Sequence, residues 1–199
     1  MEFIGITGGV GAGKSRILKF IEENYNAKVL LADEVAHELM EPGGDCYEKI
    51  IKAFPGEDIL RDDGAFDTGK LASVIFSDRE KRERMNGIVH PVVKEEILGI
   101  YQKEKEKGNF SYFILEAALL IEEGYDTICD RLWYIDTRRE IRRQRLKEGR
   151  GYSDEKIDSI FKSQLPEETY RKYAALVIDN NGNPEETIAQ VKKAFPPFE

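Results

Sequence analysis

The sequence has little cysteine, no long apolar run and no excess of positive charge. Its two cysteines, Cys46 and Cys129, lack CxxC spacing and a nearby histidine cluster, which argues against a zinc site and a disulfide framework. No apolar stretch approaches the roughly 20 residues that span a bilayer, and glycines near the first residues interrupt any signal-peptide pattern. We therefore expect a cytoplasmic protein with reduced thiols.

Acidic residues outnumber basic ones, 38 to 30, which gives a formal net charge of -8 and a pI of about 5.1. This balance argues against binding nucleic acid or an anionic membrane through overall charge. An anionic ligand must instead meet a local concentration of positive charge. A chain of 199 residues is long enough for one well-buried domain with smaller appendages.

A glycine-rich stretch near the start of the chain, GGVGAGKSR, matches the phosphate-binding pattern G-x-x-x-x-G-K-S/T. Glycines let backbone N–H groups point at phosphate oxygens, and the following helix aims its positive end at the same charge. Lys14 is expected to reach the β and γ phosphates, and Ser15 to bind Mg²⁺. The alternative is a glycine turn without a ligand. The residues expected to hold the nucleotide are Gly11, Ala12, Gly13, Lys14, Ser15 and Arg16.

Short apolar stretches alternate with helical patterns along the chain. The expected strands are residues 2–7, 27–33, 110–116, 131–136 and 174–179. This alternation predicts an α/β fold with a parallel sheet covered on both faces. Between residues 46 and 108 the pattern is helical with little strand, with one helix ending and another starting at His90-Pro91. The sequence therefore predicts a helical insertion in an α/β core.

Carboxylates follow two of the expected strands. Asp33 is expected to close the second strand and to emerge beside the phosphate-binding loop, at the carboxyl edge of the sheet. A carboxylate there can orient an attacking hydroxyl and accept its proton; the alternative is a cap for the helix expected from Glu34. Glu116 ends another strand and is a candidate to organise Mg²⁺ through water, against a simple surface turn.

A basic helix is expected between Arg138 and Arg150, where six arginines and one lysine face two glutamates. Arg138, Arg142 and Arg145 fall on one stripe of this helix. Because arginine forks match phosphate geometry, we expect the stripe and Arg150 to face an anion as part of a lid. The alternative for such a run of charge is a solvated helix face.

Taken together, these stretches resemble the dephospho-CoA kinases, which transfer the γ-phosphate of ATP to the ribose 3′-hydroxyl of dephospho-CoA. The resemblance covers nearly the whole chain. It rests on GITGGVGAGKS (5–15), LADEVAHELMEPG (31–43), FSD (76–78), VHP (89–91), ALLIEEG (118–124), RQRLKEGRGYS (143–153), SQLPEE (163–168) and VIDNNG (177–182).

The resemblance implies a P-loop kinase that binds ATP, Mg²⁺ and dephospho-CoA, with no nucleic-acid or membrane partner, as a monomer or weak homo-oligomer. Asp33 matches the base for the 3′-hydroxyl, and Lys14 and Arg145 match charge-stabilising positions. Three parts are implied: a core of about residues 1–40, 109–137 and 172–199, a CoA-binding insertion of about 41–108, and a lid of about 138–165.

The same resemblance implies further binding residues. His90, Pro91 and Leu120 match positions that contact the acceptor. Arg150 matches a nucleotide-binding position, and Asn180 lies in the stretch that passes near adenine.

The chain departs from the family pattern at several positions. Leu31 stands where an aspartate is usual, and Glu116 and Ala118 replace an aspartate and a proline. A GTPase is disfavoured because the sequence has no N-K-x-D segment. Two alternatives stay open: another small-molecule kinase, acting on nucleosides or nucleoside monophosphates, and an ATP-binding regulatory protein without transfer activity.

Overall fold

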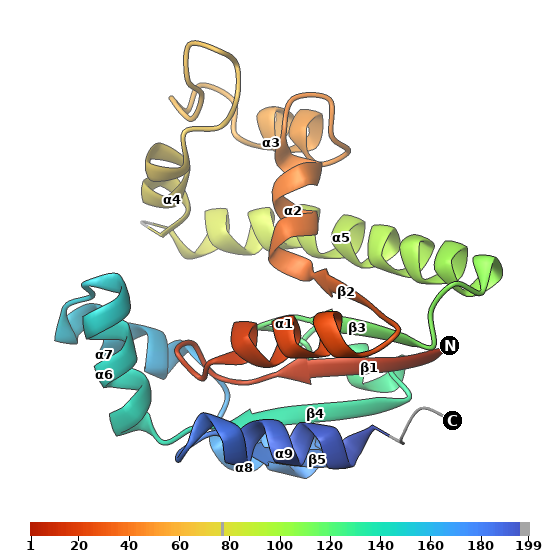
Figure 1. The fold of residues 1–199 in the computed structure, drawn as a ribbon. Helices are drawn as coiled ribbons and strands as arrows, with labels where there is room; N and C mark the ends of the chain where they lie inside the picture. Colours follow the sequence, from red (N-terminus) through yellow and green to blue (C-terminus); the bar gives the residue numbers. More distant parts are fainter. Residues whose placement is uncertain (77, 196–199) are drawn as a thin grey trace. The chain divides into compact units, whose positions relative to one another are not determined.

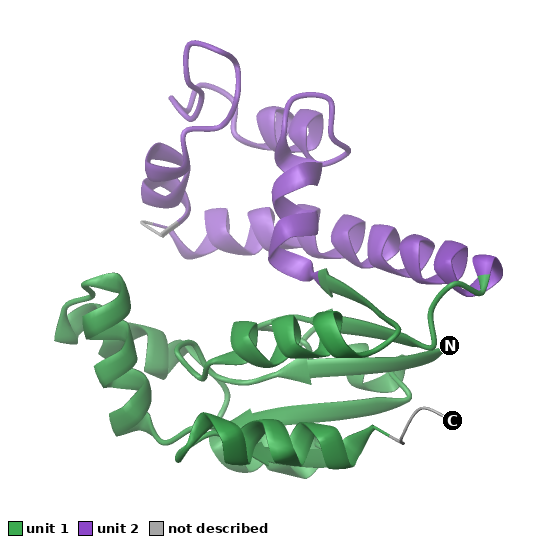
Figure 2. Cartoon of the chain, viewed as in Figure 1, with its two compact units in different colours: residues 1–30, 108–199 green, residues 31–107 purple. Residues whose placement is uncertain are grey.

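The computed structural model describes residues 1–76 and 78–195, so the FSD motif is described only in part. The chain divides into two compact units (Figure 2). Residues 1–30 and 108–199 make up the sheet unit, and residues 31–107 make up the helical unit. Both cysteines are free thiols. Among the described residues, no helix combines the length and apolarity that crossing a bilayer requires.

The sheet unit is built on five strands in the order β2-β3-β1-β4-β5. Their bounds are β1 Glu2–Thr7, β2 Ala27–Leu31, β3 Tyr112–Glu116, β4 Arg131–Asp136 and β5 Leu176–Asp179. β1 pairs in parallel with both β3 and β4, and β4 pairs in parallel with β5. The predicted α/β fold with a parallel sheet is therefore confirmed, and β1 lies at its centre.

Helices cover both faces of this sheet (Figure 1). The helices of this unit are α1 Lys14–Asn24, α6 Arg139–Arg150, α7 Asp154–Ser163, α8 Glu167–Tyr173 and α9 Pro184–Ala194, with a short 3₁₀ turn, η1, at Tyr125–Thr127. α6 and α7 lie beyond the carboxyl ends of the strands. The Trp133 ring lies 5.1 Å from the ring of Phe195, which directly follows α9. Tyr134 stacks instead on Tyr170 of α8, at 5.1 Å. Because successive strand residues point to opposite faces, α8 and α9 cover opposite sides.

The helical unit consists of α2 Ala32–Met40, α3 Tyr47–Ala53, α4 Thr68–Phe76 and α5 Arg79–Lys107. α5 packs against each of the other three helices. The buried residues at its core are Cys46, Ile50, Phe54, Ile59, Phe66, Leu71 and Met85. The unit begins at Leu31 and not at residue 41, because α2 packs against α5.

The expected break at His90-Pro91 is wrong, since α5 continues through Pro91. A proline inside a helix removes one hydrogen bond and crowds the carbonyl four residues earlier, at a cost of about 3 kcal/mol. Met85, Val93 and Ile97 are buried at helical spacing on both sides of the proline. Their burial stabilises one continuous helix against that local cost.

Candidate active site

The loop between β1 and α1 needs glycine for steric reasons. Gly13 has φ of 87°, in the left-handed region, and a Cβ atom there would lie 2.6 Å from Nδ2 of Asn180. A Cβ atom at Gly9 would lie 2.1 Å from Cζ of Arg142. Side chains from distant parts of the sheet unit therefore pack directly on the backbone of this loop.

Carbonyl oxygens of the loop are hydrogen-bonded to the protein. Nζ of Lys14 donates to the Gly8 carbonyl at 2.7 Å, and Nε of Arg142 donates to the Val10 carbonyl at 2.9 Å. The first four N–H groups of α1 have no partner within the helix. A loop whose carbonyls face the protein, followed by a helix amino terminus, is an arrangement that binds phosphate through backbone N–H groups.

The carbonyl of Ala12 accepts three hydrogen bonds. Its donors are Oγ1 of Thr137 at 3.0 Å, Nη1 of Arg145 at 3.2 Å and Nδ2 of Asn180 at 2.6 Å. Arg145 also donates through Nη2 to the Asn180 carbonyl at 3.2 Å. The predicted catalytic Arg145 thus contacts the phosphate loop itself, from the second turn of α6.

Lys14 lies between two oxygen groups at the carboxyl edge of the sheet. Besides the bond to Gly8, its Nζ is 3.3 Å from Oε1 of Glu116, at the end of β3. Both side chains are largely buried, at 13% and 15% exposure, so this ion pair is little screened by water. The structure therefore places Glu116 beside the phosphate loop, where it neutralises the lysine.

Arg142 is buried and does not face an anion site as predicted for the arginine stripe. Its guanidinium is buried, lies 4.5 Å from the centre of the Phe161 ring and donates to Oε1 of Gln164. Burial lowers the pKa of this guanidinium from its usual value. The stripe is not a single anion-facing surface, because Arg138 instead bonds to Asn181. Through its contacts with Val10, Phe161 and Gln164, Arg142 of α6 connects the phosphate loop with α7 and the residue that follows it.

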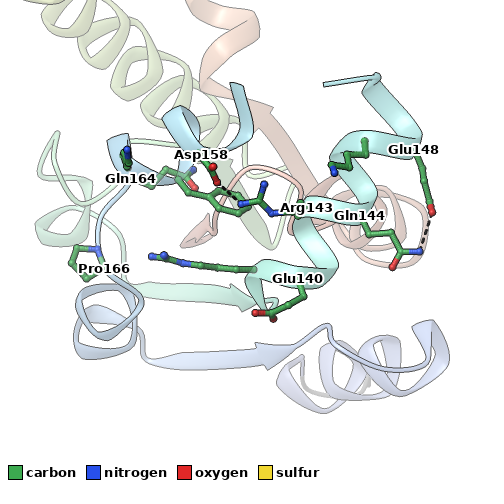
Figure 3. Close-up of a pocket in the computed structure, with 11 residues that line it drawn as sticks. Glu140, Arg143, Gln144, Glu148, Asp158, Gln164 and Pro166 are labelled. Carbon is green, nitrogen blue, oxygen red and sulfur yellow. Dashed lines mark hydrogen bonds and ion pairs between the residues drawn. The ribbon is translucent and has the colours of Figure 1, made fainter. Parts of the chain in front are cut away.

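A hollow of about 880 Å³ lies along α6 and α7, and its described lining residues come from these helices and from Gln164 and Pro166 (Figure 3). Three of its cations have carboxylate partners: Arg143 pairs with Asp154 and Asp158, Lys147 with Asp154, and Arg139 with Glu167. These carboxylates make the hollow a poor place for an anionic ligand.

The other residues expected at the nucleotide site are Ser15, Arg16 and Arg150. Ser15 and Arg16 are exposed in the first turn of α1, where the expected contacts require them. Arg150 is exposed at the end of α6, with its guanidinium carbon 6.0 Å from the Tyr152 ring.

Asp33 is not the last residue of a strand, which corrects the sequence prediction. β2 ends at Leu31, and Asp33 is exposed in the first turn of α2, within the helical unit. Asp33 is not the N-cap of α2 either, because Leu31 occupies that position. An acidic residue in the first turn interacts favourably with the positive end of the helix dipole, which explains why the helix begins earlier than predicted.

The expected acceptor residues lie in different surroundings. His90 and Pro91 lie in the middle of α5, with Pro91 exposed. Leu120 has no exposed surface, and its Cδ1 would lie 2.8 Å from a Cβ atom at Gly5. The structure therefore does not support Leu120 as a contact to the acceptor.

Sequence reasoning missed four residues around the loop: Thr137, Phe161, Gln164 and Thr187. Thr137 directly follows β4, and that position at the carboxyl edge was a usable signal. Phe161 and Gln164 had no such signal, because their role depends on how α7 packs against α6.

Comparison with known proteins decides which kinase family this loop belongs to. Residues 2–186 match the family model described as dephospho-CoA kinase. The chain belongs to the dephospho-CoA kinase family. A dephospho-CoA kinase of Aquifex aeolicus is 38% identical over 195 residues, which cover 98% of this chain and 96% of that protein.

Solved structures show the same fold as this dephospho-CoA kinase family member. A dephospho-CoA kinase from Campylobacter jejuni gives a TM-score of 0.72 at 23% identity and covers 98% of this chain and 96% of its own. A shikimate kinase from Acinetobacter baumannii, in complex with shikimate, gives 0.54 at 16% identity, with coverages of 97% and 91%. The sheet unit therefore has the P-loop kinase fold.

Proposed function

We propose that this protein transfers the γ-phosphate of ATP to the ribose 3′-hydroxyl of dephospho-CoA, giving CoA and ADP. The observation that carries the proposal is the loop from Gly8 to Gly13. Its carbonyls accept hydrogen bonds from side chains of the protein, and Lys14 directly follows it. Family membership supports dephospho-CoA as the acceptor.

The nucleotide is held by backbone N–H groups of the loop and of the first turn of α1, and Arg150 is a further candidate contact on the lid. When the nucleotide binds, the ammonium group of Lys14 leaves the Glu116 carboxylate and pairs with the β and γ phosphates, because the carboxylate and the phosphates compete for it. The residues assigned to this contact are Gly11, Ala12, Gly13, Lys14, Ser15 and Arg16.

The residues near the loop fit Mg²⁺. Among the described residues, no group of three or more His, Cys, Asp and Glu side chains is arranged to hold a metal ion. Mg²⁺ in kinases uses few protein oxygens, because waters and substrate phosphates supply the rest. We propose that Ser15 Oγ would be its protein ligand and that Glu116 would accept a hydrogen bond from a water on the ion. When bound, the ion would neutralise charge on the β and γ phosphates.

The transfer step needs a base and a cationic surround. Asp33 accepts the proton of the 3′-hydroxyl as that oxygen bonds to the γ-phosphorus, and the bond to the bridging oxygen of ADP breaks. Lys14 and Arg145 neutralise the charge that develops on the transferring group. Arg145 does so by exchanging the carbonyls of Ala12 and Asn180 for phosphate oxygens.

Two further parts complete the proposal. The helical unit, with His90 and Pro91 on α5, binds the acceptor. The segment of about residues 138–165 acts as a lid, whose closure excludes water and limits hydrolysis of ATP.

The test is an assay with ATP and dephospho-CoA in which the product is identified by mass and by the ribose hydroxyl that is modified. We expect a single phosphate on the 3′-hydroxyl. Nucleoside monophosphates and shikimate serve as competing acceptors. Phosphorylation of one of these but not of dephospho-CoA would reverse the assignment, and ATP binding without any transfer would support the regulatory alternative.

A further inference from the structure

We propose that Thr137, directly, and Thr187, through Asn180, are positioning residues that set the direction and the donor strength of the Gly13 N–H group in the phosphate loop. The inference rests on the proposed function, because this N–H group matters only when the loop holds a nucleotide.

Three donors surround the Ala12 carbonyl. A carbonyl oxygen has two lone pairs, yet the Ala12 oxygen accepts from Thr137, Arg145 and Asn180. Ala12 is 1% exposed, so water does not compete for this oxygen. Its direction is therefore fixed by Thr137 and Asn180, from the segments after β4 and β5, with Arg145 of α6 as a third donor until it turns to the phosphate.

The peptide group between Ala12 and Gly13 links the direction of this carbonyl to that of an N–H group. The Ala12 carbonyl and the Gly13 N–H belong to one planar trans peptide, so they point in opposite directions. Fixing the carbonyl toward the protein fixes the N–H away from it, toward the proposed phosphate position. Hydrogen bonds also polarise one another along a chain, so donors on the Ala12 oxygen make the Gly13 N–H a stronger donor.

The Asn180 amide has a defined orientation between the Ala12 carbonyl and the Thr187 hydroxyl. Oγ1 of Thr187 is 3.0 Å from Oδ1 of Asn180 and 3.1 Å from the Asp179 carbonyl. The Ala12 carbonyl can only accept, so the amide nitrogen of Asn180 faces it; in the flipped amide, two acceptor oxygens would face each other. Oδ1 of Asn180 is then left to accept from the Thr187 hydroxyl, which it shares with the Asp179 carbonyl. Thr187 is 3% exposed, so its hydroxyl supports this orientation without competition from water.

This arrangement changes the role expected for Asn180. Its side chain is buried and bonded to Ala12 and Thr187, so the side chain supports the loop and a contact with adenine would fall to the backbone of Asn180. A purely structural role for Thr187, as a brace between α9 and the end of β5, predicts lost stability with no specific effect on nucleotide.

The first experiment compares Thr187→Val and Thr137→Val, which remove a hydroxyl at constant shape, with Thr187→Ser and Thr137→Ser, which keep it. We expect each valine variant to raise the KM for ATP and weaken ADP binding by about threefold to tenfold, the effect of one lost hydrogen bond. The KM for dephospho-CoA should stay unchanged. The serine variants should restore nucleotide affinity.

The second measurement observes the peptide itself. Ala12-Gly13 is the only Ala-Gly pair in the sequence, so labelling alanine with ¹³C at the carbonyl and glycine with ¹⁵N gives one correlated NMR signal. Removing a donor from the Ala12 oxygen should move its carbonyl ¹³C and the Gly13 ¹⁵N upfield in the valine variants. This signal reports on the peptide even if a variant loses some stability.

The outcomes separate this inference from the proposed function. If the unmodified protein fails to bind ADP, the proposed function fails. If it binds ADP while all four variants bind equally well and the Gly13 signal does not move, the positioning role is refuted. Equal increases in KM for both substrates would also overturn it, because they would indicate general destabilisation.

Discussion

Single side chains around the phosphate loop act chiefly on the backbone. Lys14 and Arg142 each donate to a loop carbonyl, and three further side chains share the carbonyl of Ala12. A loop built in this way holds its shape before any ligand binds, which lowers the entropy lost on binding.

Asp33→Asn tests the assigned base. The variant keeps the shape of the side chain but cannot accept a proton, so we expect turnover to fall at least about 100-fold. ATP binding should be unchanged, because the phosphate contacts lie in the other unit. Glu34→Gln is the matched control, since Glu34 is exposed in the same helical turn. Full activity in Asp33→Asn would exclude the role.

The thiol of Cys129 should be inert. Burial, with smaller effects from Asp130 and Asp126, raises its pKa from the usual 9.0 to about 12. Thiolate is the reactive form, so a disulfide reagent at pH 8 should modify the native protein slowly and the urea-unfolded protein rapidly. Rapid modification of Cys129 in native buffer would contradict its burial.

The same pKa shift of Cys129 predicts a pH dependence of stability. The unfolded thiol ionises near 9.0, while the native thiol stays protonated to about 12. The contribution of this group is therefore complete below pH 9 and is lost as pH rises from about 9 to 12. Urea denaturation between pH 8 and 10.5 should show falling stability, and Cys129→Ala should reduce the slope.

The position of the phosphate loop, with Lys14, Ser15 and the glycines between β1 and α1, could be predicted from sequence, because its spacing is local. Thr187 could not, because its bond to Asn180 exists only after α9 packs beside β5.

At the scale of elements, neighbouring arginines on α6 have opposite surroundings. Arg142 is buried against Phe161, whereas Arg143 pairs with the exposed Asp154 and Asp158. α6 therefore has one face that contacts the loop and another that carries ion pairs at the surface.

Arg142→Met should cost about 2–3 kcal/mol in the free energy of unfolding, because the Val10 carbonyl and Gln164 lose a charged donor. Arg143→Met, the control on the same helix, should change it much less, since exposed ion pairs contribute little. Urea denaturation of both variants measures the difference. Equal losses would show that Arg142 does not fasten α6 to the loop.

Strands and most helices could be read from the sequence because their apolar patterns are local. Pro91 misled the prediction because local geometry disfavours a helix there, whereas Met85 and Ile97 pack on either side of it. Asp33 was misplaced for a related reason, since an exposed acidic residue fits both a strand end and a first helical turn.

Ligand binding should stabilise the whole molecule. ADP at 100 times its dissociation constant should add about 2.7 kcal/mol, which raises the Tm by about 5–10 °C for a chain of this size. Lys14→Ala should lose most of this shift. Lys19→Ala is the control, because Lys19 lies on the same helix and is 74% exposed. An undiminished shift in Lys14→Ala would contradict the phosphate-loop assignment.

The division into two units could be anticipated from the loss of strand patterns after residue 46, although its boundary at Leu31 could not. That boundary depends on α2 packing against α5, which no local pattern encodes.

Both neighbours of the central strand β1, β3 and β4, lie far from it in the sequence. The bond from Thr7 to Ala117 spans 110 residues, and that from Phe3 to Asp130 spans 127. Contacts this distant form slowly, whereas those of the helical unit lie between residues 31 and 107. During synthesis on the ribosome, we expect the helical unit to form before β1 pairs with β3 and β4, which leaves the apolar side chains and unpaired edges of β1 accessible to chaperones.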